Sequence, residues 1–130
     1  MPMNDGACDL RSKTCVPCEG GVPQLTAAEA EALRAQVPAW TLVEAGRPTL
    51  HAPSAPYRRI ERGFVFRDFA SALAFVNAVG AVAEAEGHHP DILVHSWRKV
   101  SLALTTHAIK GLSENDFILA AKIDAIGGAA

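Results

Sequence analysis

The sequence is poor in aromatic residues, in cysteine and in any excess of charge of one sign. Phe, Trp and Tyr make up only 6% of the 130 residues, so Ala, Val, Leu and Ile must fill the core. Three cysteines are an odd count and too few for the disulfide framework of a small secreted domain. The 12 Lys and Arg residues almost balance the 14 Asp and Glu residues, which leaves a net charge of -2. A disulfide-dependent fold and the basic footprint of a nucleic-acid-binding protein are therefore both excluded.

Long apolar runs and targeting signals are lacking too. Residues 1–5 have neither the cationic nor the apolar region of a secretory signal. The longest apolar stretch, Phe69–Ala85, is shorter than the roughly 20 residues of a membrane span and contains Ser71 and Asn77. With 49% hydrophobic residues, the chain can still bury a core without disulfides. We expect a soluble, cytoplasmic protein whose partner is a small molecule rather than a membrane or a nucleic acid.

Two regions differ in pattern, and they define the predicted domain organisation. Residues 1–23 combine Gly and Pro with little periodicity, which predicts an irregular or mobile N-terminal arm, whereas residues 24–130 are predicted to form one domain. Because the arm precedes the first helix cap, we expect its deletion to leave folding largely intact. It holds all three cysteines, Cys8, Cys15 and Cys18. Their spacing matches neither a complete zinc site nor a redox motif between a strand and a helix, which favours reduced thiols.

Hydrophobic periodicity and helix caps predict seven regular elements in the domain. Thr26 with Glu29, and Ser113 with Asp116, have the spacing of capping boxes, and Gly87 suits the left-handed end of a helix. Helices are expected over 27–37, 69–86 and 114–126, and strands over 40–44, 59–66, 91–94 and 99–106. This order predicts an α+β two-layer sandwich, in which a four-stranded antiparallel sheet carries three helices on one face.

The same patterns predict which side chains are buried. In the last strand, Val100, Leu102 and Leu104 should face the helices, and the alternate residues should lie on an open face. The expected apolar stripe of the second helix is Phe69, Leu73, Val76, Val79 or Gly80, and Ala83. In the second strand, Arg62 falls at the edge of the apolar side, whereas Arg59 falls on the polar side.

Three histidines carry the strongest chemical signal. His88 and His89, followed by Pro90, stand between a helix end and a strand start, where side chains on rigid elements reach solvent. Pro90 keeps His89 extended, so the two imidazoles should point in different directions. His107 ends the last strand, and the hairpin should bring it back toward the pair. Three histidines in one pocket favour general acid/base catalysis, because imidazole gains and loses a proton near neutral pH.

Two other interpretations of these residues stay open. A catalytic zinc site would need all three imidazoles to aim at one point, which the diverging neighbours His88 and His89 make difficult, so metal-free catalysis is favoured. Alternatively, the two histidines are surface residues whose positive charge stabilises a helix C-terminus, and Ser113 and Asp116 only cap a helix.

Several linked motifs across residues 25–126 resemble the pterin-4a-carbinolamine dehydratases. The motifs are Glu86–Asp91, Trp97–Val100, Leu104–His107, Gly111–Asp116 and Ala120–Asp124, preceded by Pro38–Trp40, Ile60–Phe69 and Ala74–Val76. The resemblance implies the α+β fold, homo-oligomers such as a dimer or a tetramer, and elimination of water from 4a-hydroxytetrahydropterin to give quinonoid dihydropterin. It implies no metal and no tightly bound cofactor. The chain departs from the family where Arg98 replaces the usual Asn after the aromatic residue.

The resemblance also assigns site residues. The implied catalytic residues are His88, His89 and His107, with His88 and His107 as acid and base and His89 mainly holding the pterin. The implied substrate-binding residues are His89, Pro90, Trp97, Thr106 and Asp116. An aromatic amino acid hydroxylase or another pterin-dependent enzyme would supply the substrate. The alternative function is a pterin-binding or protein-interaction module, since family members in animals also act as partners of a transcription factor.

Overall fold

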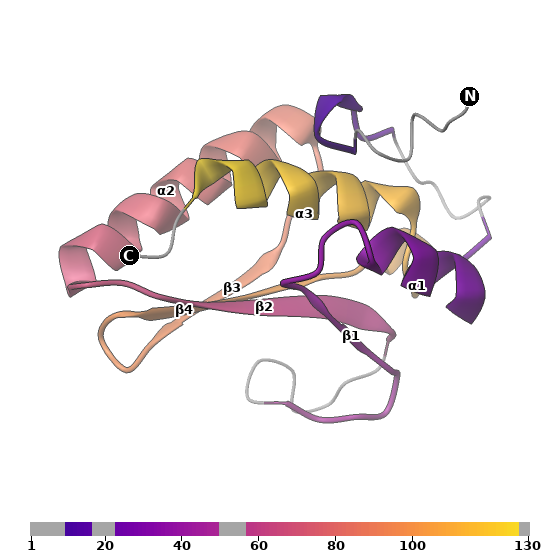
Figure 1. Cartoon of the computed structure of the whole chain (residues 1–130), viewed down its shortest axis with the longest axis horizontal. Coiled ribbons are helices and arrows are strands. Elements are labelled where there is room, and N and C mark those ends of the chain that lie inside the picture. The colour runs from indigo at the N-terminus through magenta and orange to yellow at the C-terminus, as the bar shows by residue number, and fades with distance from the viewer. Residues whose placement is uncertain (1–9, 17–22, 50–56, 128–130) are drawn as a thin grey trace.

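The computed structural model describes residues 10–16, 23–49 and 57–127, and its elements follow the predicted order (Figure 1). In chain order they are α1 (Ala27–Arg34), β1 (Thr41–Val43), β2 (Arg59–Val65), α2 (Phe69–Glu86), β3 (Asp91–His95), β4 (Lys99–Leu104), the 3-10 helix η2 (His107–Ile109) and α3 (Glu114–Ile126). The predicted α+β architecture is confirmed.

The four strands form one antiparallel sheet in the order β1-β2-β4-β3. β2 and β4 are its central strands, and their register pairs Ile60 with Leu104 and Phe64 with Val100. Helices α2 and α3 lie side by side across one face of the sheet, and α1 packs beside β1 (Figure 1). The core is therefore enclosed between one layer of strands and one layer of helices, as the alternating pattern predicts.

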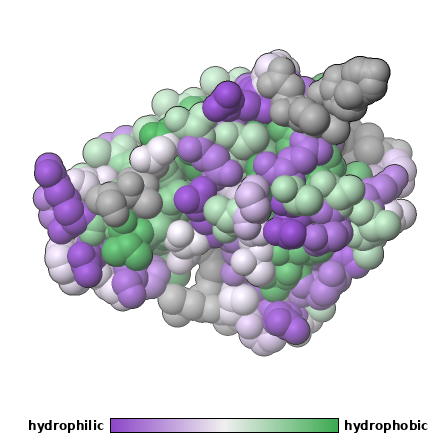
Figure 2. All heavy atoms as spheres, viewed as in Figure 1, coloured by the Kyte–Doolittle hydropathy of each residue, from purple (hydrophilic) through white to green (hydrophobic). Residues whose placement is uncertain are grey.

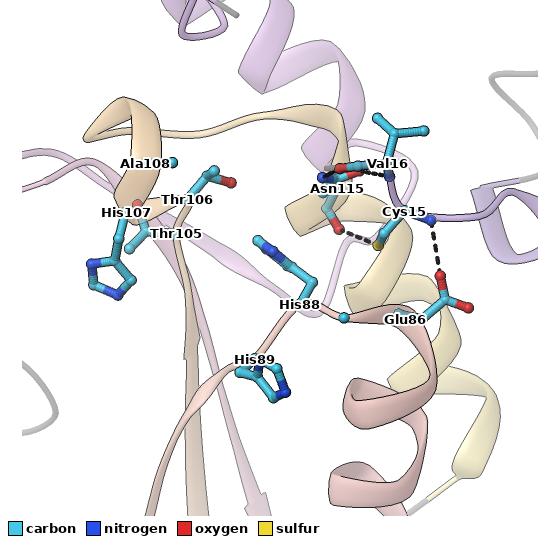
Figure 3. A pocket seen from close by; sticks show the side chains of 11 residues that line it. Cys15, Val16, Glu86, His88, His89, Thr105, Thr106, His107, Ala108 and Asn115 are labelled. Carbon is cyan, nitrogen blue, oxygen red and sulfur yellow. Dashed lines mark hydrogen bonds between the residues drawn. The ribbon is translucent and has the colours of Figure 1, made fainter. Parts of the chain in front are cut away.

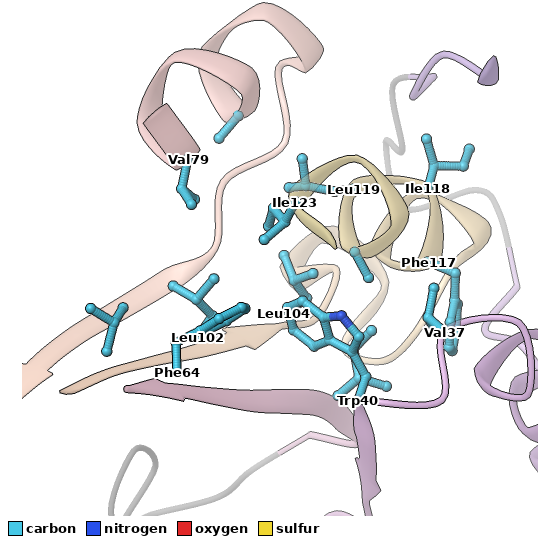
Figure 4. Close-up of a cluster of buried hydrophobic side chains, with 14 of the residues drawn as sticks. Val37, Trp40, Phe64, Val79, Leu102, Leu104, Phe117, Ile118, Leu119 and Ile123 are labelled. Carbon is cyan, nitrogen blue, oxygen red and sulfur yellow. The ribbon is translucent and has the colours of Figure 1, made fainter. Parts of the chain in front are cut away.

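The centre of the core lies between β4 and the helix layer. Val100, Leu102 and Leu104 have no exposed surface, which confirms the predicted apolar face of β4, but Ala103 of the predicted open face is buried as well. They belong to one buried cluster with side chains of the other elements, among them Val79, Phe117, Leu119, Ile123 and Trp40 (Figure 4). Full burial of each large apolar side chain is worth about 1.5–3 kcal/mol. The Trp40 indole Nε1 donates a hydrogen bond to Asp124 Oδ1 at 2.9 Å, so its polar atom is satisfied as well.

The buried face of α2 differs from the predicted stripe. Phe69 and Leu73 are 50% and 39% exposed. The buried residues of α2 are Ala72, Phe75, Val79 and Ala83, of which only the last two were predicted. The helix is apolar around most of its circumference, and apolar surface runs along it in Figure 2, so periodicity alone could not select the packed face. Phe75 marks that face, because its ring centroid lies 4.6 Å from that of Phe64 and 5.0 Å from that of Phe66.

Length and composition also distinguish α2 among the described residues. It is long and apolar enough to cross a membrane, and 22% of its residues are buried. By these two criteria alone, Ser71 and Asn77 lower the apolar content too little to exclude a span. Helices that cover a sheet in globular proteins meet the same two criteria, so the finding assigns no membrane location.

The end of α1 also differs from the prediction. The helix ends at Arg34 rather than at Val37. Beyond it the chain continues in two hydrogen-bonded turns, in which the Val37 N–H bonds to the Arg34 carbonyl and the Trp40 N–H to the Val37 carbonyl. These turns place Val37 and Trp40 in the core, with 2% and 1% of their surface exposed.

Two arginines of β2 have partners that the strand pattern does not indicate. Arg62 lies at the edge of the apolar face, as predicted, and pairs there with Asp124 of α3. Arg59 was predicted on the polar face, yet it is buried. The Glu61 carboxylate and the Arg47 carbonyl bond to its guanidinium, because the segment after β1 folds over this part of the sheet.

The described part of the predicted arm, residues 10–16, is packed against the domain, and we call it the arm segment. It is irregular apart from a short 3-10 turn at residues 10–12. Leu10 is 3% exposed and belongs to the core cluster. Further along, the segment bonds to Glu86 at the end of α2 and to Asn115 at the start of α3. Residues 10–16 therefore pack on the domain, although a segment without periodicity offers no sequence signal of packing, and the predicted effect of deleting the arm stays a prediction.

Candidate active site

A cleft of about 400 Å³ opens where four segments of the chain meet. It is lined by residues 15–16 of the arm segment, by residues 86–89 at the end of α2, by residues 105–108 after β4, and by Asn115 at the start of α3 (Figure 3). These segments lie far apart in the sequence, so the packing of the arm and the helices on the sheet creates the cleft.

The end of α2 separates the two neighbouring histidines. Gly87 has a φ of 66°, a left-handed conformation that glycine adopts without steric cost. The His88 N–H still bonds to the Ala83 carbonyl at 3.2 Å, which fixes the backbone as it leaves the helix. The His88 side chain is then 13% exposed and points into the domain, whereas the His89 side chain is 63% exposed. The predicted divergence of the two imidazoles is confirmed.

His88 and the buried carboxylate of Asp116 form the central pair of the cleft. His88 Nε2 lies 2.7 Å from Asp116 Oδ1, and Asp116 has no exposed surface. The other oxygen, Oδ2, accepts hydrogen bonds from the Thr106 hydroxyl at 2.8 Å and from the Ser113 N–H at 3.0 Å. An ionised Asp116 therefore has a donor on each oxygen, which is how a buried charge is stabilised. In the tautomer that carries its proton on Nε2, His88 donates to this carboxylate, and Nδ1 is then the ring nitrogen left for a ligand.

The Thr106 and Ser113 partners of Asp116 come from the turn between β4 and α3. The Thr106 N–H bonds to the Gly111 carbonyl at 2.8 Å, so β4 ends two residues earlier than predicted. The Thr106 hydroxyl then lies 2.8 Å from Ser113 Oγ. The capping interpretation of Ser113 and Asp116 is correct for the Ser113 N–H. Capping alone does not account for Asp116, because its second oxygen binds His88.

The other two predicted histidines line the cleft from more exposed positions. His89 Nε2 lies 2.9 Å from Glu84 Oε1 of α2. His107 was expected at the end of a strand, but it begins η2, and its ring meets the Tyr57 ring edge-on with centroids 5.7 Å apart. Figure 3 shows His88 between His107 and the arm segment. The predicted gathering of three histidines around one cleft is thus present in the geometry.

Three predicted site residues do not line this cleft in the described chain: Asp116, which lies buried behind His88, Pro90 and Trp97. Pro90 directly follows His89, so it shapes the backbone at the rim. Trp97 lies in the turn between β3 and β4, at the other end of the hairpin, and is 59% exposed. Strand direction explains the separation, because residues at opposite ends of a hairpin cannot share one pocket.

Reasoning from the sequence missed Cys15, Glu86 and Asn115 as cleft residues. Glu86 accepts the Cys15 N–H at 2.8 Å and pairs with Lys122 at 3.0 Å, and these two contacts hold the pKa of the Glu86 carboxyl below its usual value. Burial, reinforced by the charge of Glu86, raises the pKa of the Cys15 thiol to about 12. The thiol is therefore protonated and unreactive near neutral pH. The cysteine spacing favoured a reduced thiol, which agrees with this state, but it gave no signal of the packing at the cleft.

Metal binding was weighed for the histidines and for the cysteines. Within residues 10–16, 23–49 and 57–127, no group of three His, Cys, Asp or Glu side chains is arranged to hold a metal ion. Cys8 and Cys18, which a cysteine site would require, lie outside the described residues. The cleft therefore offers proton-transferring groups: imidazoles, a buried carboxylate and hydroxyls.

The fold and the cleft define an α+β two-layer domain with a histidine–carboxylate site, and sequence comparison identifies its family. The family model described as pterin 4 alpha carbinolamine dehydratase matches residues 23–126. A Halorhodospira halophila protein is 49% identical over 118 residues, 91% of this chain and 97% of its own. A Methylococcus capsulatus protein is 45% identical over 124 residues, 95% and 98% of the two chains. Both carry the provisional name pterin-4-alpha-carbinolamine dehydratase. This chain belongs to the pterin-4a-carbinolamine dehydratase family.

Two solved structures resemble this one. The crystal structure of a transcriptional coactivator/pterin dehydratase from Brucella melitensis matches with a TM-score of 0.64 and 35% identity, over 81% of this chain and 99% of the other. A pterin dehydratase-like protein described as a RuBisCO assembly factor in the alpha-carboxysome matches with a TM-score of 0.51 and 25% identity, over 71% and 93%. Because one fold carries such different descriptions, the activity of this chain has to be argued from its own cleft.

Proposed function

We propose that this protein is a dehydratase that eliminates water from 4a-hydroxytetrahydropterin and releases quinonoid dihydropterin. The observation that carries the proposal is the 2.7 Å contact between His88 Nε2 and the buried Asp116 carboxylate, in a cleft that His89 and His107 also line. Family membership supplies the substrate class. The cleft supplies side chains that gain and lose protons near neutral pH.

The elimination needs two proton transfers and no change of oxidation state. The 4a-hydroxyl is protonated so that it leaves as water, and the ring nitrogen system loses a proton as the new carbon–nitrogen double bond forms. His88 and His107 are the proposed acid and base, because they border the cleft on different segments of the chain. Each positioned acid or base contributes on the order of 10²–10⁴ in rate.

The remaining polar groups bind the pterin or position the reacting groups. Asp116 acts through His88, whose ring it orients, and the Thr106 hydroxyl holds the Asp116 carboxylate in turn. His89 binds the substrate at the rim, and Pro90 holds the His89 backbone extended. We leave Trp97 out of the proposed substrate contacts, because it lies at the other end of the hairpin.

The proposal is tested by turnover in the absence of metal ions. Purified protein, treated exhaustively with EDTA, should accelerate the dehydration of synthetic 4a-hydroxytetrahydropterin above the uncatalysed rate, as followed by absorbance in a stopped-flow instrument. Loss of activity on chelation, with recovery on addition of zinc, would replace histidine acid/base catalysis with a metal mechanism.

A binding module without turnover is the second candidate function. The feature that favours it is the exposed apolar surface of α2, which includes Phe69 and Leu73. Two structural relatives are described as a transcriptional coactivator/pterin dehydratase and as a RuBisCO assembly factor. Pterin binding without acceleration of the dehydration would favour this candidate over the enzyme.

The proposed assembly is a homo-oligomer, either a dimer or a tetramer. Its support is again apolar surface left exposed on one chain, at Phe69 and Leu73 of α2 and at Ile92 of β3. Light scattering of the purified protein measures the mass directly, and a monomer at micromolar concentration would contradict the assembly. The proposed substrate source is an aromatic amino acid hydroxylase, which a hydroxylase gene next to the gene for this protein would support.

A further inference from the structure

The arm segment is anchored to the domain at three separate points. Leu10 is buried in the core at one end of it. Lys13 Nζ pairs with the Glu114 carboxylate at 2.6 Å in the middle. At the other end, side chains of α2 and α3 bind the backbone of Cys15 and Val16. The segment therefore has a defined path that ends at the cleft.

The anchoring at the cleft uses the backbone of Cys15 and Val16 together with the Cys15 thiol, which donates to the Asn115 carbonyl at 3.6 Å, and it leaves the Val16 side chain available. Asn115 bonds to Val16 twice: Oδ1 accepts the Val16 N–H at 3.0 Å, and Nδ2 donates to the Val16 carbonyl at 2.5 Å. Glu86 Oε1 accepts the Cys15 N–H at 2.8 Å (Figure 3). These bonds fix the two residues, whose side chains then line the cleft.

The two side chains complement the polar side of the cleft. The N–H and the carbonyl of Val16 are both hydrogen-bonded, yet its side chain is 63% exposed. An apolar side chain is therefore fixed at the rim of the cleft, where its exposure to water is unfavourable. The Cys15 thiol donates to the Asn115 carbonyl, so toward the cleft it presents a small and only weakly polar group. A bicyclic pterin presents hydrogen-bonding groups at its edges and flat, weakly polar faces. A site for such a ring needs polar side chains at the edges and an apolar wall against a face.

We propose that the arm segment is a wall of the pterin-binding cleft, with Val16 in contact with the ring and Asn115 as the positioning residue that holds Val16 in place. This inference rests on the proposed function, because it takes a pterin as the ligand. It gives the arm a role in substrate affinity and none in proton transfer. Loss of the wall therefore raises KM and leaves kcat nearly unchanged.

The principal test is the Asn115→Leu variant. Leucine has nearly the size of asparagine but neither donates nor accepts, so both bonds to Val16 are lost. We expect KM for 4a-hydroxytetrahydropterin and Kd for dihydrobiopterin, a stable pterin probe, to rise about tenfold, with kcat within about twofold of wild type. An unchanged KM and Kd in a folded variant would overturn the proposal.

A second readout follows the arm itself and requires no turnover. In a Cys8→Ser, Cys18→Ser background, Cys15 is the single thiol, and its alkylation by iodoacetamide reports whether the arm is docked. Alkylation should be slow at neutral pH, slower with dihydrobiopterin bound, and faster after Asn115→Leu. Unchanged alkylation in Asn115→Leu would show that Asn115 does not hold the arm. Faster alkylation with an unchanged Kd would show that the arm is not a wall.

Two further variants separate affinity from stability. Asp124→Ala removes the carboxylate that accepts hydrogen bonds from Trp40 and Arg62 near the other end of α3, so it should lower the melting temperature and leave KM unchanged. Val16→Asp alters an exposed side chain, so it should keep the wild-type melting temperature and raise Kd about tenfold, since a charge replaces the apolar contact. An unchanged Kd in Val16→Asp would overturn the proposal even if Asn115→Leu fails to fold. A wild-type protein that neither binds nor dehydrates pterins would instead overturn the proposed function.

Discussion

The two ends of the β3–β4 hairpin are built differently, although family motifs mark both of them. At the cleft end, His88 and Thr106 converge on Asp116, a carboxylate with no exposed surface. The other end lies roughly 15 Å away by strand length. There Trp97 is 59% exposed, and it follows Ser96 in a turn where both residues have positive φ, 54° and 51°.

The cleft end of the hairpin has the features of a functional site, whereas the Ser96–Trp97 end has those of a chain-reversing turn. Left-handed backbone costs a non-glycine residue roughly 1–2 kcal/mol, so the Ser96–Trp97 turn is strained. It nevertheless has a local reason, because it reverses the chain between paired strands, and the Arg98 guanidinium lies 5.3 Å from the Trp97 ring. At the cleft end, the segment after α2, the turn after β4 and helix α3 each contribute a group to one network around a buried carboxylate. Convergence of separate elements, more than an unusual turn, therefore identifies the candidate site.

The largest expected effect comes from removing the acid and base at the cleft end. His88→Ala and His107→Ala should each lower kcat on the order of 10²–10⁴, because each loses a proton-transferring group. Since both act in one elimination, the double variant should lose less than the product of the two single losses. Steady-state kinetics measures this, with circular dichroism to verify the fold. If both single variants kept the wild-type kcat, the two imidazoles would line the cleft without taking part in proton transfer.

A smaller loss is expected when the buried carboxylate is changed. Asp116→Asn should lower kcat by about a hundredfold. The uncharged amide accepts a hydrogen bond from His88 Nε2 less strongly than the carboxylate, so the imidazole is oriented less well. The melting temperature should fall too, because a mismatched buried polar group costs about 1–3 kcal/mol. Asp91→Asn, at an exposed position of β3, is the matched control. If Asp116→Asn lost stability but kept its kcat, Asp116 would be a helix cap only.

A change at the rim should affect binding more than turnover. His89→Ala should raise KM by about tenfold with a small change in kcat, because it removes an interaction present in both the ground state and the transition state. Glu84→Gln, which alters the partner of His89 and leaves the imidazole, should raise KM less. A fall in kcat as deep as that of His88→Ala would assign His89 to proton transfer instead.

The smallest effect is expected at the far end of the hairpin. Trp97→Ala should leave kcat and KM within about twofold of wild type, because Trp97 lies outside the cleft. The same steady-state assay measures it beside the cleft variants. A clear rise in KM would mean that the far end reaches a substrate after all, through a neighbouring copy of the chain in an oligomer.

Features set by neighbours in the sequence could be predicted. The capping box of Thr26 and Glu29 forms as its spacing indicates, and Gly87 ends α2 in the left-handed conformation. Alternation in β4 correctly places Leu102 and Leu104 on the buried face. These features depend on hydrogen bonds and side-chain directions within a few residues, so residues that are close in the sequence determine them.

Features that depend on packing between layers could not be predicted. α2 is apolar nearly all round, so the sheet rather than its own pattern selected Phe75 over Phe69 as a core residue. Arg59 follows the polar alternation of its strand, yet the segment after β1 covers it. β4 also ends earlier than its pattern predicts, because the Thr106 N–H bonds to the Gly111 carbonyl instead of continuing the pairing with a neighbouring strand.

The order of the elements, their caps and the family motifs were therefore contained in the sequence, as were three histidines as candidates for proton transfer. Their arrangement came from packing. His88 and Asp116 are 28 residues apart, and Val16 and Asn115 are 99 apart. Such pairs meet only when two helices and the arm settle on one face of the sheet. Local patterns state which residues are buried or capped, but they carry no distance between residues that far apart along the chain.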